Sequence, residues 1–278
     1  MRLQIAHEVT FHFDTPALYA VQILRMMPRG SSQQFINDWR IDVSADCRLS
    51  PVEDPFGNWT HTFSVDGPLD SLTISASGEV MTEETNGVIR GTPERLPLAV
   101  YLRETALTAV DADLAAKAAD IMAECGSEPI TALHALMGWV SEALAPAPET
   151  LAPAASPAKA LSRKEGTSTD RAHVFVAAAR AVGIPARYVS GYLYSPEPGS
   201  VANGVHAWAE AYLGGQLGWV GFDPSLNLCP TDNHVRVAVA LDVINASPIR
   251  ANNTGLGETR ACKVTVDEVV SHRHQPAA

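Results

Sequence analysis

Three residue types that together can perform acyl transfer follow one another along the chain as Ser168, His206 and Asp223. A serine hydroxyl becomes a nucleophile when a neighbouring imidazole takes its proton. A carboxylate bonded to the other imidazole nitrogen fixes the tautomer and the orientation of that ring. If these side chains meet, they form the nucleophile, base and orienting acid of a catalytic triad. Whether they meet depends on the elements that carry them.

Ser168 lies at the start of a helix that the sequence predicts over residues 169–182. Nearly every position of this segment is Ala, Val or Phe, and a helix that is apolar on all sides is buried. Gly183 suits the left-handed residue that follows a helix, and Pro185 prevents continuation. At the helix start, free backbone N–H groups and the helix dipole favour negative charge, which would stabilise a thiolate or a developing oxyanion.

A purely structural role for Ser168 stays open. Ser and Thr are preferred at helix starts, and Thr167 with Asp170 has the form of a capping box in which Asp replaces the usual Glu. Asp170 is therefore predicted to be a cap rather than a catalytic acid. His173 is predicted to be a hydrogen-bonded residue of the helix rather than a base.

His206 and Asp223 can be related by strand geometry. Along residues 205–213, His206 lies on the face opposite the small apolar residues. A two-residue turn at Gly214 and Gly215 would place His206 directly opposite Asp223. A wider loop from residue 213 to 218 would shift the register by two residues and leave the pair diagonal. Both alternatives keep the two side chains on one face and within hydrogen-bonding reach.

Thr169, Trp208 and Trp219 are the candidates for lining a substrate cleft, although aromatic residues on strands more often fill cores. We expect no metal and no cofactor. His272 and His274 lie in a polar tail that offers no further ligands.

The four cysteines show no C-x-x-C or Cys/His ligand spacing, so neither a disulfide framework nor a zinc site is predicted. They are expected to be free and mostly buried thiols. The cysteines are Cys47, Cys125, Cys229 and Cys262.

Composition limits the class of protein. With 278 residues the chain is long enough for one large or two medium domains, and with 46% hydrophobic residues it can bury a core. A formal net charge of -11 argues against nucleic acid or an anionic membrane as a partner, because phosphate binding needs clustered Lys and Arg. Residues 1–15 alternate polar and apolar side chains, so we expect neither a signal peptide nor a membrane anchor and, by default, a cytoplasmic location.

The chain divides into two predicted domains. Residues 1–100 show strand alternation, as at Leu3, Ile5, Val9 and Phe11, and predict an antiparallel β-sandwich. Residues 101–270 predict two helices, over 111–124 and from Pro129 onward, a Pro/Ala-rich loop over 145–158, and the helix that follows Ser168. That loop either flanks a cleft or is a plain connection. The remaining strands are predicted at 186–194, 205–213, 217–222, 234–242 and 262–270, and residues 271–278 are expected to be disordered.

The order and spacing of several motifs resemble the bacterial transglutaminase-like superfamily, whose core is shared with papain-type cysteine proteases. The resemblance covers about residues 105 to 245, and a second one, to the region that precedes this core in the family, covers the N-terminal part of the chain. The motifs of the core are Gly183-Ile184-Pro185-Ala186-Arg187, Ser190-Gly191-Tyr192, His206-Ala207-Trp208-Ala209-Glu210 and Phe222-Asp223-Pro224; those of the N-terminal part are Arg25-Met26-Met27-Pro28-Arg29 and the turn at Asp54 to Thr60.

The resemblance implies an α+β fold with a papain-like core behind the N-terminal sandwich. It also implies amide chemistry on a peptide bond or a glutamine side chain, without cofactor or metal. By position, Ser168 takes the place of the nucleophile, His206 that of the base and Asp223 that of the orienting acid.

This chain departs from the family pattern around the nucleophile. The family normally has Cys at the position of Ser168; Thr169 and Arg171 replace other residue types, and the Pro/Ala loop replaces an aromatic strand. Hydrolysis of peptide or glutamine-type amides, favoured over cross-linking, is therefore one hypothesis, with activity reduced or lost through the serine. The other is an inactive scaffold that binds a peptide or protein partner. The oligomeric state stays open.

Overall fold

A computed structural model describes residues 1–126, 128–149, 153–196 and 204–269. The first sheet is built on two long antiparallel strands, β1 (Arg2–Met27) and β4 (Trp59–Thr82), which pair along most of their length. β13 (Thr259–Glu268) and β2 (Gln34–Val43) flank one half of this ribbon, and β12 (Ile249–Asn253) and β3 (Ser50–Glu53) flank the other.

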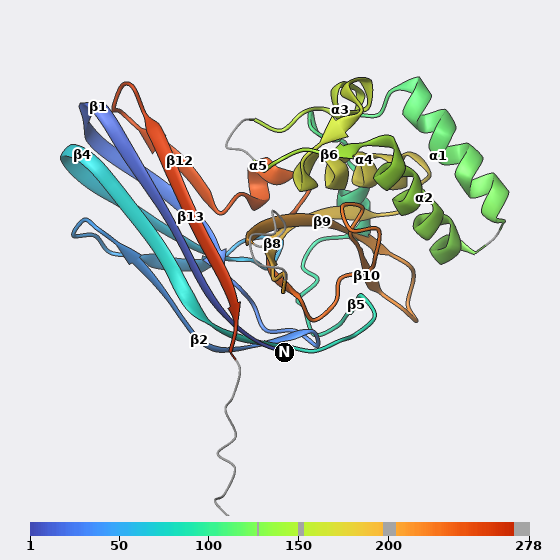
Figure 1. Cartoon of the computed structure of the whole chain (residues 1–278), viewed down its shortest axis with the longest axis horizontal. Helices are drawn as coiled ribbons and strands as arrows, with labels where there is room; N and C mark the ends of the chain where they lie inside the picture. Colours follow the sequence, from blue (N-terminus) through green and yellow to red (C-terminus); the bar gives the residue numbers. More distant parts are fainter. Residues whose placement is uncertain (127, 150–152, 197–203, 270–278) are drawn as a thin grey trace, which may run out of the picture.

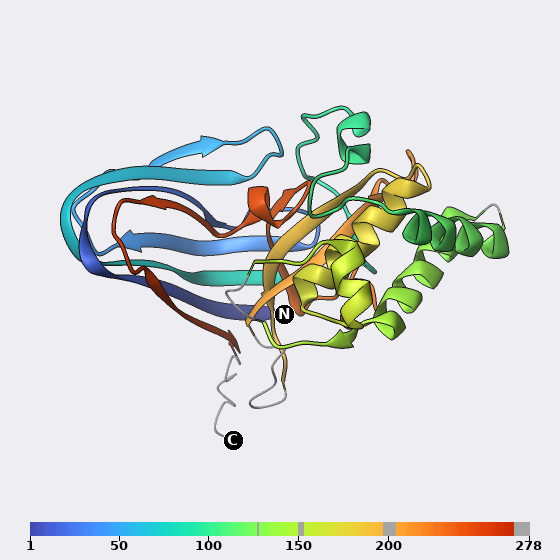
Figure 2. The same cartoon turned by 90° about the horizontal axis from the view of Figure 1, so that it is seen from above.

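The ribbon is bent in the middle, so one sheet forms two layers. The pairing of β1 with β4 shifts between His12 and Ala17, and Figure 2 shows the strands curving over at the end far from the helices. Phe11 and Ile74 from one half share a buried cluster with Leu24 and Phe63 from the other. The predicted antiparallel sandwich is therefore confirmed, with its two layers made from the same strands.

The last two strands lie in the first sheet. A strand was predicted over 262–270 as part of the second domain, but β12 and β13 both pair with β1. Residues 249–268 therefore belong to the N-terminal sheet, which corrects their assignment to the unit of residues 101–270. Strand alternation shows that one face is buried but not which neighbour supplies the hydrogen bonds.

The second sheet is antiparallel, in the order β11-β8-β9-β10-β5. One of its faces is covered by helices, as Figure 1 shows, and their apolar side chains share one core with β9 and β10. A second cluster, with Leu3 and Ile5 on one side and Tyr192 and Val235 on the other, joins this sheet to the first. The strands are β5 (Val88–Ile89), β8 (Ala186–Leu193), β9 (Gly204–Tyr212), β10 (Trp219–Phe222) and β11 (His234–Ala240).

The helices follow local signals in the sequence. α1 (Ala112–Cys125) is capped by the Asp111 carboxylate, which accepts from the Leu114 N–H, and α2 (Pro129–Ala143) begins with proline. α4 (Ser168–Ala181) is buried on nearly all sides, as predicted. None of the described helices is long and apolar enough to span a membrane.

The segment predicted as a loop over 145–158 is partly structured. β6 (Ala145–Pro146) pairs in parallel with β7 (Glu165–Gly166), and α3 (Pro157–Arg163) begins at a proline that fits the first turn of a helix. The smaller elements are η1 (Leu98–Leu102) and α5 (Val243–Ala246).

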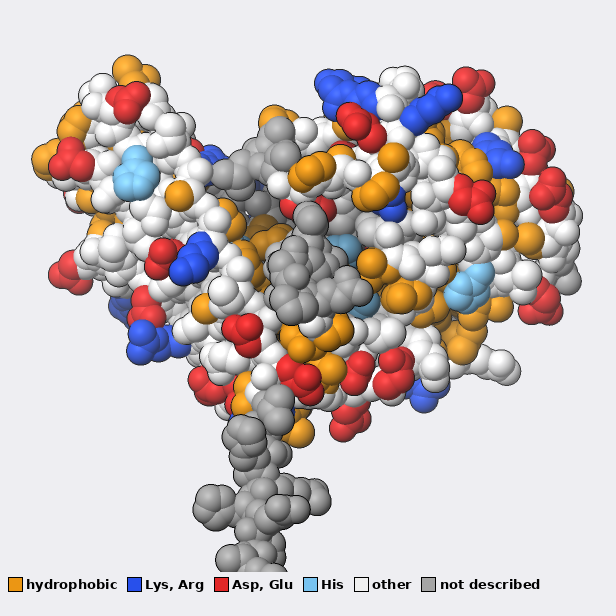
Figure 3. All heavy atoms as spheres, in the orientation of Figure 1, with side chains coloured by type: hydrophobic (Ala, Val, Ile, Leu, Met, Phe, Trp, Pro, Cys, Tyr) orange, Lys and Arg blue, Asp and Glu red, His pale blue; other side chains and the backbone are white. Residues whose placement is uncertain are grey.

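The cysteines give the outcome of one further sequence prediction. All four cysteines are free, but they are half-buried or exposed rather than mostly buried. On the face shown in Figure 3, the described Lys and Arg side chains are dispersed among Asp and Glu side chains and form no continuous basic area. The tail from Ser271, with His272 and His274, lies outside the described residues.

Candidate functional site

The start of α4 is held by the predicted capping box. The Thr167 side chain accepts from the Asp170 N–H at 3.2 Å, and Asp170 Oδ2 accepts from the Thr167 N–H at 3.2 Å. Asp170 Oδ1 also accepts from the Ala155 N–H. Asp170 is thus a cap, as predicted, and Ser168 is the first residue of the helix, where the backbone N–H has no partner within the helix.

Ser168 faces β9 at the position beside His206. Its side chain is buried, and its Oγ accepts a hydrogen bond from the backbone N–H of Ala207 at 3.1 Å. Ala207 follows His206 directly, so the packing of α4 on the sheet brings the hydroxyl to the strand that carries the imidazole.

His206 and Asp223 form a short, buried pair. His206 Nε2 lies 2.6 Å from Asp223 Oδ2, and Asp223 is fully buried. Because Nε2 is engaged by the carboxylate, Nδ1 is the ring nitrogen left to act as a base.

The register of the hairpin decides between the two predicted alternatives. Trp219 pairs with Tyr212, and the Leu213 N–H donates to the Gly218 carbonyl. The connection is therefore the wider loop, and the predicted two-residue turn at Gly214 and Gly215 was wrong. Gly214 and Gly218 take positive φ values of 84° and 70° at the two ends of this loop. The shift by two residues leaves His206 and Asp223 diagonal but on one face.

A second histidine, which the sequence did not reveal, shares the same carboxylate oxygen. His234 Nε2 lies 3.2 Å from Asp223 Oδ2, and its Nδ1 accepts from the Thr231 N–H at 3.1 Å. A backbone N–H can only donate, so Nδ1 carries no proton and the proton of the neutral ring is on Nε2. His234 therefore donates to Asp223.

The surroundings keep Asp223 ionised. Burial alone would raise the pKa of this carboxyl, but His206 and His234, which bond its Oδ2, hold the pKa well below its usual range. The other oxygen, Oδ1, accepts from the Ser225 N–H at 2.8 Å. Arg171 donates to the carbonyls of Pro224 and Ser225 nearby, and burial lowers its pKa although Asp223 acts in the opposite direction.

His206, Asp223 and His234 are also spaced like metal ligands, with one ligand atom of each within 4.8 Å of the others. The tautomer of His234 does not fit that use. A metal would need the lone pair of Nε2, which carries the proton as long as Nδ1 accepts from Thr231. The donor set therefore fits a hydrogen-bonded carboxylate better than a metal site.

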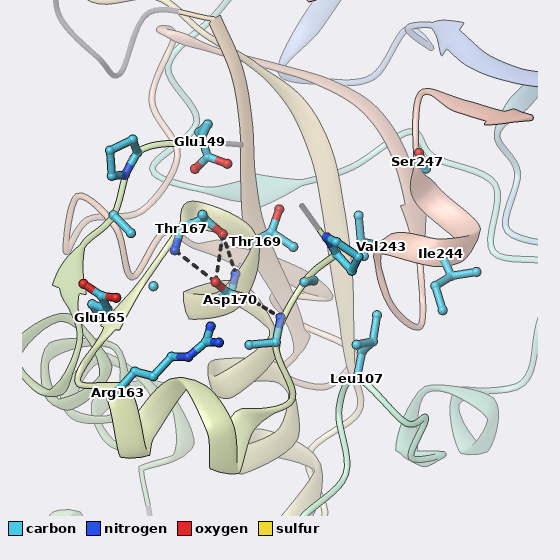
Figure 4. A pocket seen from close by; sticks show the side chains of 16 residues that line it. Leu107, Glu149, Arg163, Glu165, Thr167, Thr169, Asp170, Val243, Ile244 and Ser247 are labelled. Atoms are coloured by element: carbon cyan, nitrogen blue, oxygen red, sulfur yellow. Dashed lines mark hydrogen bonds between the residues drawn. The ribbon is translucent and has the colours of Figure 1, made fainter. Parts of the chain in front are cut away.

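A cavity of about 650 Å³ opens at the start of α4. Thr167, Thr169 and Asp170 line it together with Glu149 and Arg163 (Figure 4). The lining includes the residues on both sides of Ser168, but neither His206 nor Asp223.

Of the three predicted cleft residues, only Thr169 reaches this cavity; its Oγ1 lies 3.1 Å from the hydroxyl of Tyr188. Trp208 and Trp219 are 1% and 3% exposed and fill core clusters, which corrects their assignment to the cleft. Both lie on strands of the sheet with neighbours packed over them, so their apolar surface is used inside the protein.

Comparison with known proteins decides the family. A sequence profile of the transglutaminase-like superfamily matches residues 116–224, and a profile of the bacterial transglutaminase-like N-terminal region matches residues 3–81. The chain therefore carries a transglutaminase-like core, preceded by the N-terminal region of bacterial transglutaminase-like proteins. The matched core contains Ser168, His206 and Asp223, whereas His234 lies beyond its end.

Relatives of this transglutaminase-like protein include uncharacterized mycobacterial proteins. ML0607 of Mycobacterium leprae is 29% identical over 270 residues, which cover 93% of this chain and 95% of that protein. Rv2569c of Mycobacterium tuberculosis is 32% identical over 117 residues, which cover 39% of this chain and 37% of that protein.

A solved structure shares the fold. A candidate cysteine protease from Cytophaga hutchinsonii superimposes with a TM-score of 0.72 at 20% identity, covering 98% of this chain and 92% of that one. The predicted α+β fold, with antiparallel sheets and a papain-like core, is confirmed.

In this transglutaminase-like protein, the carboxylate of Glu149 accepts a hydrogen bond from the backbone N–H of Ser168. The Ser168 N–H donates to Glu149 Oε1 at 2.6 Å, and Glu149 lies above the start of α4 in the view of Figure 4. A free N–H at this position would be a donor for the oxyanion of a tetrahedral intermediate. A substrate oxygen that uses this donor has to displace Glu149.

Removing Glu149 is expected to activate the site. With Ser168→Cys as the background, Glu149→Ala should lower the pKa of the introduced thiol by about 1 unit, because a like charge beside the thiolate disappears. The pH dependence of alkylation by iodoacetamide measures this pKa. Glu165→Ala is the matched control. Both glutamates line the cavity, but the carboxylate that accepts from the Ser168 N–H is that of Glu149. An unchanged profile in Glu149→Ala, or an equal shift in the control, would contradict this role for Glu149.

Proposed function

We propose that this protein hydrolyses amide bonds of peptides or of glutamine side chains through an acyl-enzyme on Ser168. His206 acts as the general base and acid, and Asp223 orients it. The observation that carries the proposal is the contact chain across β9: Ser168 Oγ bonds the N–H beside His206, and His206 Nε2 bonds Asp223 at 2.6 Å. The match to a superfamily whose core is papain-like supports the same kind of chemistry.

The reaction follows from these positions. His206 Nδ1 takes the proton of Ser168 as Oγ forms a bond to the carbonyl carbon, and the carbonyl π electrons move to oxygen. The imidazolium is stabilised by ionised Asp223 and then protonates the departing amine as the C–N bond breaks. Water, activated by the same nitrogen, cleaves the acyl-enzyme and restores the hydroxyl.

The serine sets the expected rate and outcome. A hydroxyl is a poor acid and depends on His206 for deprotonation during attack, whereas a thiol at a helix start ionises much more readily. We therefore propose a slow enzyme. Water is far more concentrated than any amine, so hydrolysis is proposed over cross-linking.

A peptide- or protein-binding scaffold without catalysis is the second candidate. One specific observation favours it: both groups at Ser168 that the reaction uses are already engaged, the N–H by Glu149 and the hydroxyl by the Ala207 N–H. In this case the cavity at the start of α4 would bind the partner and Ser168 would act only as a helix-start residue.

An acyl-transfer assay separates the two candidates. We expect the unmodified protein to release p-nitroaniline from γ-glutamyl p-nitroanilide, or p-nitrophenol from an acyl p-nitrophenyl ester, at least roughly 100-fold faster than Ser168→Ala. Mass spectrometry with added glycine methyl ester reports whether the free acid or the amide is formed, and the acid should dominate. Equal rates for the unmodified protein and Ser168→Ala would leave the scaffold as the function.

A further inference from the structure

His234 has no part in the roles assigned so far, yet it bonds the same carboxylate oxygen as His206. We propose that His234 is a positioning residue, which holds the Asp223 carboxylate in the one orientation that lets Oδ2 bond His206. This inference rests on the proposed function and adds a fourth residue to that site.

The ring of His234 is fixed on both sides. Its Nδ1 accepts from the Thr231 N–H at 3.1 Å, and its Nε2–H donates to Asp223 Oδ2 at 3.2 Å. The ring is 1% exposed and packs edge-on against Trp208, with ring centroids 5.3 Å apart. A flip of the imidazole would set the Cδ2–H group against the Thr231 N–H and turn Nε2 away from Asp223, so both hydrogen bonds of the ring would be lost.

Asp223 is thereby held through both oxygens. Oδ1 accepts from the Ser225 N–H, and Oδ2 accepts from two imidazoles. Without His234, only His206 would hold Oδ2, and the carboxylate could turn away from the ring it orients. Partners that orient a catalytic or ligating side chain in this way typically contribute about 10–100-fold.

The donors around Asp223 also favour its ionised form. The groups that face Asp223 are His206 from β9, His234 from β11 and Arg171 from α4. Each of them favours the ionised carboxylate, which in turn stabilises the imidazolium of His206. Loss of one donor should therefore destabilise the imidazolium form of His206 and raise the pH at which a thiol at position 168 ionises.

The test uses Ser168→Cys as the background and measures alkylation by iodoacetamide against pH. Adding His234→Phe should lower the alkylation rate by about 10–100-fold and move the midpoint of thiol ionisation to higher pH. His234→Gln keeps an N–H donor at this place and should restore most of the rate. His134→Phe is the matched control, because the His134 ring packs on Phe222, the neighbour of Asp223, without bonding the carboxylate.

The outcomes separate the two proposals. If the introduced thiol is unreactive in the parent variant, the proposed function fails. If the thiol is reactive and His234→Phe leaves the profile unchanged, only the positioning role fails.

A second measurement needs no substitution. Nitrogen-15 NMR of the imidazoles in the unmodified protein should show His234 protonated on Nε2 only, and a proton on Nδ1 would overturn the proposal.

Discussion

Replacing Ser168 with cysteine is expected to create a thiol that iodoacetamide alkylates roughly 100-fold faster, at about pH 6, than an ordinary cysteine. The position combines the start of a buried helix with the strand that carries His206. Helix N-termini and a neighbouring imidazolium both favour the thiolate, so a large fraction of the thiol should be ionised where an ordinary cysteine is almost fully protonated. Alkylation rates followed by intact mass measure this difference.

The four native cysteines are the internal control. Burial raises the pKa of the thiols of Cys47, Cys229 and Cys262, so these react slowly at the pH of the test. Peptide mapping locates the modified residue. Adding His206→Gln to the Ser168→Cys variant should remove most of the acceleration, and a rate that does not depend on residue 206 would contradict the role given to the imidazole.

Glu210→Gln is expected to lower the free energy of unfolding by about 3–5 kcal/mol, the cost of removing one partner from a buried charge network. Glu210 is fully buried on β9, with Oε2 at 2.6 Å from Arg187 Nε and Oε1 at 2.7 Å from Arg236 Nε. The substitution leaves two buried guanidinium groups facing a neutral amide. Urea unfolding at about pH 7 measures the loss.

Glu94→Gln is the control for this network. Glu94 also contacts Arg187, at 3.2 Å, but its side chain is 37% exposed, so its loss should cost less than about 1 kcal/mol. Similar losses in the two variants would show that burial of Glu210 does not decide the effect.

The sign of the pH dependence follows from the pKa of Glu210. Burial alone would raise this pKa, but Arg236 and Arg187 hold it below its ordinary value of 4.5. The contribution to stability is therefore fully present above that ordinary value and is lost as the pH falls through the folded-state pKa. The unfolding free energy of Glu210→Gln should accordingly change less on acidification than that of the unmodified protein.

Local sequence signals predicted much of the candidate site. The capping box of Thr167 and Asp170, the apolar helix and the same-face relation of His206 and Asp223 all depend on residues close in sequence or on strand periodicity. The same-face relation held although the simplest turn was wrong, because a register shift of two residues preserves the face.

Long-range pairing accounts for what the sequence did not reveal. His234 begins a strand whose place beside β8 is set by sheet order, and nothing in its own neighbourhood indicates a bond to Asp223. Glu149 lies in a Pro/Ala-rich segment that showed no helix or strand period. The return of residues 249–268 to β1 likewise depends on which edge of a sheet is free, which periodicity does not report.

Aromatic and thiol side chains were predicted least well. Trp208 and Trp219 have the chemistry of cleft residues, but each fills space between the strand and its neighbours, where burial of a large ring stabilises the fold most. The cysteines show the opposite error, since they were expected to be mostly buried and are half-buried or exposed. Residue type gives only an average tendency to be buried, and the packing around each position decides its exposure.

The central claim is that His206, oriented by Asp223, activates the side chain at position 168 in the unmodified protein. Labelling with a fluorophosphonate tests it most directly, since this reagent forms a stable bond only with an activated hydroxyl. We expect one adduct for each chain, located on Ser168 by peptide mapping and absent from Ser168→Ala and from His206→Gln. An unlabelled protein, or an adduct on another residue, would contradict the claim.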